Sequence, residues 1–167
     1  MNKETKLTSL KKTSKVFAIF AKIFEVFSYV GAGICAVAAG LIATDSLSIG
    51  LKMVQPDDAD KIYNMLSQHM EMKPALIIFM ILLIIFMFIN AFLMRKIGTL
   101  FRNINNDYSP FIPENTKLIK IIAVLGAVIA LIEVGVVPAV MVGFILWGVA
   151  LLFDYGCELQ TESDEIL

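Results

Sequence analysis

The sequence is most constrained by an uncharged run of 21 residues, Pro74–Met94, which lies between Lys73 and Arg95. As an α-helix rising about 1.5 Å per residue, such a run is long enough to cross the roughly 30 Å of hydrocarbon in a bilayer. Hydrophobic residues make up 58% of the 167-residue chain and charged residues only 17%, whereas soluble domains carry about 25% charged residues. We therefore expect an all-α integral membrane protein.

An earlier span is expected over residues 16–43, which follow a lysine-rich segment at 1–15. Between Glu25 and Asp45 the chain has 19 uncharged residues, which is enough for one crossing. Basic residues before an apolar run also describe a secretory signal peptide, but the apolar region here is far longer than the usual stretch of about 7–15 residues. We therefore interpret it as a retained span.

Residues 121–153 contain a single charge, Glu133. As one helix they would measure about 50 Å, which is too long for a bilayer without extreme tilt. Gly135 and Pro138 offer a natural break, so this region is predicted to form two spans joined by a very tight outer turn. Together with the uncharged run 74–94, this gives four predicted spans, at 16–43, 74–94, 116–134 and 138–154.

The distribution of lysine and arginine predicts the orientation. Five basic residues lie in 1–15 and five in 95–120, against three in the 30-residue loop 44–73, with Lys22 left aside inside the first span. Because cytoplasmic segments carry the excess of basic residues, the N-terminus and the middle loop are expected inside the cell. We therefore predict a four-helix bundle with both termini inside the cell. Its parts are a basic N-terminus at 1–15, a membrane domain at 16–157 and an acidic tail at 158–167.

The two longer connections differ in character. The outer loop 44–73 is polar, with an amphipathic helix predicted after Asp57, and it is either a connector on the membrane surface or a lid or sensing element. The inner loop begins at Arg95 as an amphipathic continuation of the preceding span. Pro113 suits the first turn of the next helix, where Glu114 would favour the positive end of the helix dipole.

No motif for catalysis, metal binding or cofactor binding is present. His69 is the only histidine, and it lies in the outer loop, on the opposite side of the membrane from Cys157. The chain has no Gly-rich phosphate loop, and its net charge of −1 gives no basic face for nucleic acid. We therefore predict that the protein is not an enzyme, holds no metal or cofactor and does not bind nucleic acid directly.

Polar side chains within spans are candidates for function. Lys22 and Glu25 are three residues apart, so they share a helix face and are expected to pair near the membrane interface. Glu133 is either an interfacial group or the mark of a water-filled cavity. Asn90 is expected to form a hydrogen bond with a neighbouring helix.

Small residues recur four positions apart in three of the spans. In lipid such rows let helix backbones approach closely, and they serve either packing within one bundle or self-association into a homo-oligomer. The residues concerned are Gly31, Cys35 and Ala39 in the first span, Gly126 and Ala130 in the third, and Ala139 and Gly143 in the fourth.

Two stretches resemble a known family. The inner loop reads Leu100-Phe101-Arg102-Asn103-Ile104, then Pro110-Phe111 and Pro113-Glu114-Asn115, with Leu118 beyond; the C-terminus reads Phe153-Asp154-Tyr155-Gly156-Cys157-Glu158-Leu159-Gln160 before an acidic run. Together they are similar to the YoaS-like family of small four-span bacterial membrane proteins, for which no activity is established. The resemblance implies a location in the bacterial plasma membrane and a pairing with small helix-turn-helix regulators.

We take eight residues of these stretches as candidates for docking a partner: Phe101, Arg102, Phe111, Asn115, Gly156, Leu159, Gln160 and Glu162. The tail from Asp154 carries five acids and no base, and it either solvates the chain end or docks a basic partner.

Three functions are therefore open at this point: a membrane-embedded regulatory or sensory partner of a helix-turn-helix regulator; a small transporter, channel or immunity protein acting within the bilayer; and a structural accessory subunit. The bilayer is a partner in all three.

Overall fold

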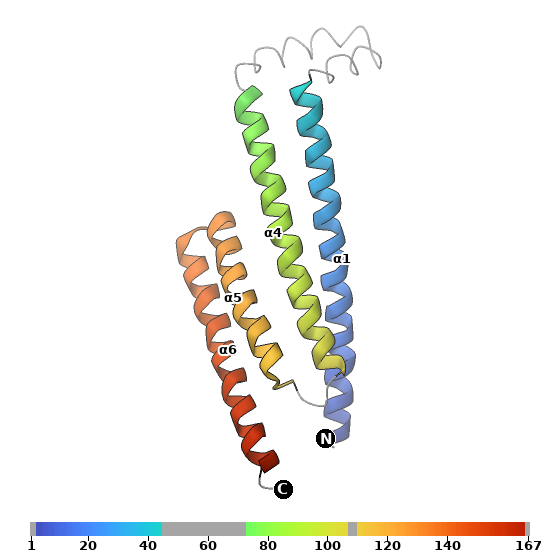
Figure 1. The fold of residues 1–167 in the computed structure, drawn as a ribbon, viewed down its shortest axis with the longest axis vertical. Helices are drawn as coiled ribbons and strands as arrows, with labels where there is room; N and C mark the ends of the chain where they lie inside the picture. The colour runs from blue at the N-terminus through green and yellow to red at the C-terminus, as the bar shows by residue number, and fades with distance from the viewer. Residues whose placement is uncertain (1–2, 45–72, 107–109, 166–167) are drawn as a thin grey trace. The chain divides into compact units, whose positions relative to one another are not determined.

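A computed structural model describes residues 3–44, 73–106 and 110–165. All regular structure in this part of the chain is α-helical, which confirms the predicted fold class. The helices are α1 (Lys3–Ala43), α4 (Lys73–Asn106), α5 (Pro113–Glu133) and α6 (Val136–Glu165), shown in Figure 1. The outer loop, with its predicted amphipathic helix and His69, lies outside the described residues.

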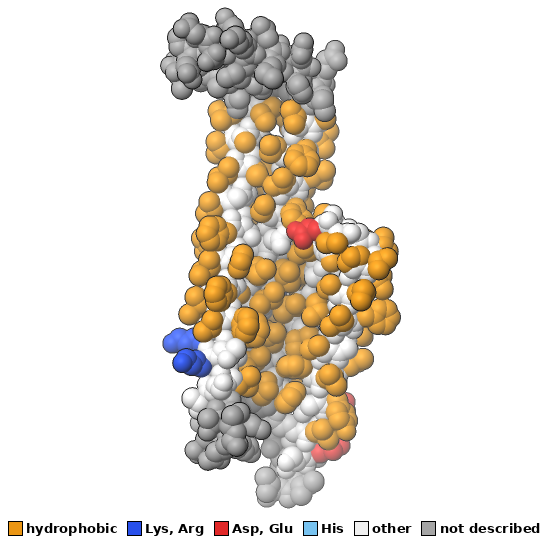
Figure 2. All heavy atoms as spheres, turned by 180° about the vertical axis from the view of Figure 1, so that it is seen from behind, with side chains coloured by type: hydrophobic (Ala, Val, Ile, Leu, Met, Phe, Trp, Pro, Cys, Tyr) orange, Lys and Arg blue, Asp and Glu red, His pale blue; other side chains and the backbone are white. Residues whose placement is uncertain are grey.

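Each of the four helices is long and apolar enough to cross a membrane. Their large hydrophobic side chains are extensively exposed, for example Phe27, Phe144 and Leu152. The face drawn in Figure 2 is accordingly covered by hydrophobic side chains, with few charged ones. A soluble protein does not expose so continuous an apolar surface, so these helices indicate a multi-pass membrane protein.

The described helices belong to two compact units. The first comprises Met1–Val26 and Ile89–Leu167, and the second comprises Phe27–Phe88. Helices α1 and α4 pass through both units, whereas α5 and α6 lie entirely in the first.

In the first unit, α1 and α4 pack through small and aromatic side chains. A Cβ atom built on Gly98 would lie 3.5 Å from the Cβ of Ala21, so the missing side chain allows the two helices to approach closely. One turn away, the rings of Phe17 and Phe101 stack with their centroids 5.0 Å apart. Offset ring pairs at this distance add about 0.5–1.5 kcal/mol to the area they bury.

In the second unit, two contacts join the same pair of helices. The sulfur of Met87 lies 3.5 Å from a Cβ built on Gly31. The rings of Tyr29 and Phe88 meet edge to face at 6.0 Å. Gly31 of the first small-residue row therefore faces α4, while Cys35 and Ala39 are half-buried.

Helices α5 and α6 form an antiparallel hairpin, the α5–α6 hairpin. The small residues expected to permit close packing lie between them: a Cβ on Gly126 would be 3.3 Å from Leu146 Cδ1, and one on Gly143 would be 3.5 Å from Ala127 Cβ. Ala130 is half-buried and Ala139 is buried. Close backbone approach gives van der Waals contact, which drives helix association in lipid.

The helices extend beyond the predicted spans. Helix α1 begins at Lys3 rather than at residue 16, and α6 continues through the acidic tail to Glu165. Lys, Glu, Leu and Gln are all good helix formers, so the helices continue past the apolar segments. Pro138 lies in the first turn of α6. Proline is tolerated there because the backbone N–H groups of a first turn have no acceptor within the helix, so the N–H that proline lacks is not missed.

The chain reverses between α5 and α6 at Val134 and Gly135. Gly135 has φ +110°, a backbone conformation that residues with a Cβ rarely adopt. Replacing Gly135 with alanine is expected to lower the free energy of unfolding by about 1 kcal/mol or slightly more, measured by SDS titration in mixed micelles.

A matched control for this substitution is Gly33→Ala in α1, where an added Cβ meets no atom within 4 Å. There the better helix propensity of alanine should leave stability unchanged or raise it. Equal effects at the two glycines would contradict the role given to the positive φ.

Candidate docking site

The end of α4 and the start of α5 are joined through the buried amide side chain of Asn115. Asn115 is 0% exposed. Its Nδ2 donates to the carbonyl oxygen of Pro110 at 2.9 Å, and its Oδ1 accepts from Nδ2 of Asn103 at 3.0 Å. Its backbone N–H donates to the carbonyl of Ile112, which has extended backbone at the N-cap of α5. Asn115 thus holds residues 110–115 against the last turns of α4.

Residues just before α5 also pack on the far end of α6. The ring of Phe111 lies 5.2 Å from that of Phe153, centroid to centroid. It also covers Gly156 so closely that a Cβ there would approach Phe111 Cε1 to 2.7 Å and Cγ to 2.9 Å. Real Cβ contacts of this length essentially do not occur, so this position in α6 admits only glycine while Phe111 stays in place.

Two polar contacts continue the same interface. Lys120 Nζ lies 2.6 Å from Asp154 Oδ2, and the two side chains are each partly exposed. Thr116 Oγ1 and Cys157 Sγ lie 3.7 Å apart. We call the interface formed by residues 110–120 and 153–157 the loop–helix junction. Through it, the two stretches singled out in the sequence contact each other, although 41 residues separate Thr116 from Cys157.

The last turns of α6 present an exposed face. Tyr155 and Leu159 are 59% and 48% exposed, and Glu158 and Glu162 are exposed beside them. These four residues are spaced i, i+3, i+4 and i+7, so they share one face of the helix. We call them the docking face. Tyr155 and Glu158 were not among the candidates from sequence, although the helical spacing to Leu159 and Glu162 would have indicated them.

The other docking candidates have different surroundings. Asn115 is buried and engaged within the chain, which leaves it no surface for a partner, and Gly156 lies under Phe111. Phe101 stacks on Phe17, and Gln160 is half-buried. The remaining four candidates, Arg102, Phe111, Leu159 and Glu162, are exposed.

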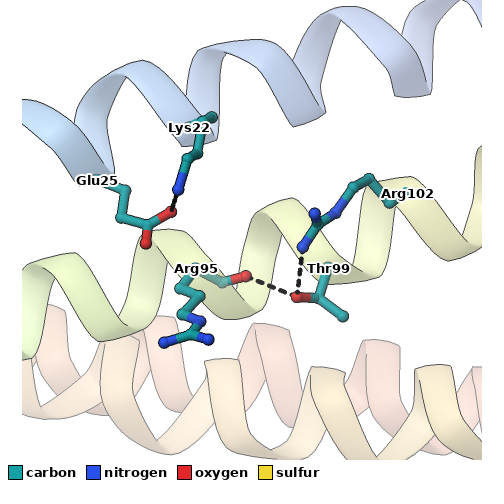
Figure 3. Close-up of polar contacts among 5 residues, drawn as sticks. All are labelled: Lys22, Glu25, Arg95, Thr99 and Arg102. Atoms are coloured by element: carbon teal, nitrogen blue, oxygen red, sulfur yellow. Dashed lines mark hydrogen bonds and ion pairs between the residues drawn. The ribbon is translucent and has the colours of Figure 1, made fainter.

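Arg102 lies on the last turns of α4. Its guanidinium donates to Thr99 Oγ1 at 3.3 Å, and that hydroxyl donates to the carbonyl oxygen of Arg95 at 2.9 Å (Figure 3). Both bonds are exposed to solvent, so they hold the side chain along α4 without removing its charge from the surface.

No family model matches this chain. No curated protein and no solved structure matches it significantly either.

Of the polar residues expected in the spans, Lys22 and Glu25 pair, with Nζ and Oε2 3.0 Å apart (Figure 3). The Lys22 side chain is 68% exposed and that of Glu25 only 9%. The lysine thus reaches outward while the carboxylate lies against the protein, as a snorkelling pair does. Glu133 is exposed at the last residue of α5, and Asn90 is half-buried.

Among the described residues, no group of three or more His, Cys, Asp or Glu side chains is placed to hold a metal ion. Cys35 and Cys157 are both free thiols.

Proposed function

We propose that this protein is a membrane-embedded regulatory partner of a small cytoplasmic helix-turn-helix regulator, which it binds through the docking face. The observation that carries the proposal is the loop–helix junction. It unites the two stretches that resemble the YoaS-like family, and it leaves an amphipathic helix face exposed beside them.

The chemistry of the docking face suits such a partner. From Asp154 to the C-terminus the chain carries five acids and no basic residue. A DNA-binding domain carries a basic surface for phosphate contacts. An acidic helix complements that surface, and the exposed side chains of Tyr155 and Leu159 supply the apolar anchors that interfaces need. Binding there would compete with DNA for the same basic surface.

The proposal also provides a route from the membrane to the partner. Asn103 of α4 is bonded to Asn115, and the segment between Pro110 and Asn115 holds Phe111 against α6. A movement of α4 that breaks the amide pair would release Phe111 and change how α6 presents the docking face. The excess of basic residues in 1–15 and 95–120 supports a cytoplasmic position for this face in a bacterial plasma membrane.

The test is a binding measurement with the full-length protein in detergent micelles and a helix-turn-helix regulator chosen from the genes that neighbour its own, as the resemblance implies. Combining Leu159→Ala with Glu162→Lys is expected to weaken binding at least tenfold, about 1.4 kcal/mol or more, because one change removes an apolar anchor and the other reverses a charge. Affinity should also fall with rising salt.

The matched control is Glu133→Lys, which reverses an exposed acid at the last residue of α5, outside both the loop–helix junction and the docking face. Binding should be little changed by it. The proposal fails if the wild-type protein does not bind the regulator, or if removing the residues after Gly156 leaves binding intact.

A further inference from the structure

Helices α5 and α6 are each long enough to cross a membrane, but the part of the α5–α6 hairpin from Lys120 to Asp154 is short for a structure that crosses a bilayer. The ion pair between Lys120 and Asp154 marks the level at which charged side chains leave the hydrocarbon at one end. From that level to Gly135 there are 15 residues along α5 (135 − 120) and 19 along α6 (154 − 135). At about 1.5 Å per residue these segments measure roughly 22 Å and 28 Å, both less than the roughly 30 Å of hydrocarbon.

Arg95 on α4 is a second charged residue from which the distance to Gly135 can be measured, and that distance is still shorter. The bond between Asn103 and Asn115 places the last turns of α4 beside the first turn of α5, and the two helices run antiparallel (Figure 1). Arg95 lies eight residues before Asn103, roughly 12 Å along the axis. Gly135 lies 20 residues after Asn115, roughly 30 Å along the axis. About 18 Å therefore separates the level of Arg95 from Gly135.

Apart from Glu133, the side chains of the turn suit a position in lipid. We define the hairpin tip as residues 132–137. Its four aliphatic side chains are highly exposed, and Glu133 is its one charged residue; Ile132 is 59% exposed, Val134 66%, Val136 67% and Val137 72%. Turns that emerge into water are ordinarily built from Gly, Asn, Asp, Ser and Pro.

Three backbone N–H groups at the turn are also hydrogen-bonded within the hairpin. The N–H groups of Val134 and Gly135 both donate to the carbonyl of Ala130, at 2.9 and 3.1 Å. The N–H of Ala139 donates to the carbonyl of Gly135 at 3.2 Å. Internal satisfaction of this kind is what backbone groups require when no water is near.

We propose that the α5–α6 hairpin is re-entrant. Both helices enter the bilayer from the side of the loop–helix junction, and the hairpin tip ends among the lipid acyl chains without emerging on the other side. Helices α1 and α4 then are the segments that cross, and the two ends of the hairpin still share one side of the membrane. This inference does not depend on the proposed regulator.

The groove along the hairpin fits the same lipid environment. It has a volume of about 660 Å³ and is lined only by apolar residues, including Ala127, Leu131, Val140 and Phe144. Acyl chains are the ligand that such a surface accepts, because it offers almost no polar group to a ligand.

The test uses a variant in which Cys35 and Cys157 are replaced by alanine and Val137 by cysteine. The new cysteine is labelled with the fluorophore NBD in detergent, and the protein is reconstituted into phosphatidylcholine vesicles. Dithionite is then added to permeabilised vesicles, where it reaches both sides of the membrane. It should reduce NBD at the tip at least tenfold more slowly than NBD attached to a Glu158→Cys variant. Nitroxides carried deep on the acyl chains should quench it more than nitroxides near the headgroups.

A Ser48→Cys variant, in the predicted outer loop, supplies the control for the opposite side of the membrane. The proposal is overturned if NBD at residue 137 is reduced as fast as NBD at residue 48 in vesicles that expose that side, or if shallow nitroxides quench it best. Val134→Cys provides a second position at the tip. Circular dichroism of each labelled protein shows that the helices are retained.

Discussion

Replacing Asn115 with alanine is expected to lower the free energy of unfolding by about 2–4 kcal/mol. The change removes a side chain that is 0% exposed and strands both of its partners, the carbonyl of Pro110 and the amide of Asn103. A fully buried group left without a hydrogen bond costs about 1–3 kcal/mol; the two partners here are half-buried, and the emptied volume adds to the cost. SDS titration of the purified protein in mixed micelles measures the loss.

Asn106→Ala is the matched control, because Asn106 is exposed and its side chain accepts a bond from the neighbouring Asn105. Its effect should stay within about 0.5 kcal/mol. Asn103→Ala completes a double-mutant cycle with Asn115→Ala, and a coupling energy of about 0.5 kcal/mol or more is expected for two residues in direct contact. An Asn115→Ala protein as stable as the control would show that the amide pair does not hold the loop.

The fold was largely predictable because bilayer thickness imposes a length on apolar segments. The apolar region 16–43, the uncharged run 74–94 and the single charge in 121–153 together predicted four apolar helices, and these are confirmed. The full lengths of the helices were not predictable from hydropathy. Lysines before residue 16 and acids after Asp154 end the apolar segments, but they do not end a helix, since Lys and Glu are good helix formers.

The candidate site was predictable only in part. Asn115 was taken as a docking candidate because it lies in a stretch that resembles a known family, but its side chain is buried. Asn103, twelve residues away, was not identifiable from the sequence as its hydrogen-bond partner. The contact between Phe111 and Gly156 joins segments that are remote in sequence. By contrast, the spacing of Tyr155, Glu158 and Leu159 is a local pattern, and it was readable once α6 was known to continue past Asp154.

Adding a single methyl group at Gly156 is expected to disrupt the loop–helix junction. A Cβ at this position would meet three ring atoms of Phe111 at distances that real contacts essentially never show. The ring must move away from α6 and give up its contact with Phe153. Overpacking of this kind costs about 1–3 kcal/mol, against which alanine regains at most about 1 kcal/mol of helix propensity. Gly156→Ala should therefore lower both the free energy of unfolding and the affinity for the regulator.

Gly148→Ala is the matched control in the same helix, because a Cβ there meets no atom within 4 Å. It should raise stability by up to about 1 kcal/mol, so the two glycines are expected to respond with opposite signs. Pairing Gly156→Ala with Phe111→Ala removes the clash, and in the Phe111→Ala background the added methyl should no longer destabilise. If Gly156→Ala is equally destabilising with and without the Phe111 ring, its effect does not arise at the junction, and the link from α4 through Phe111 to the docking face is lost.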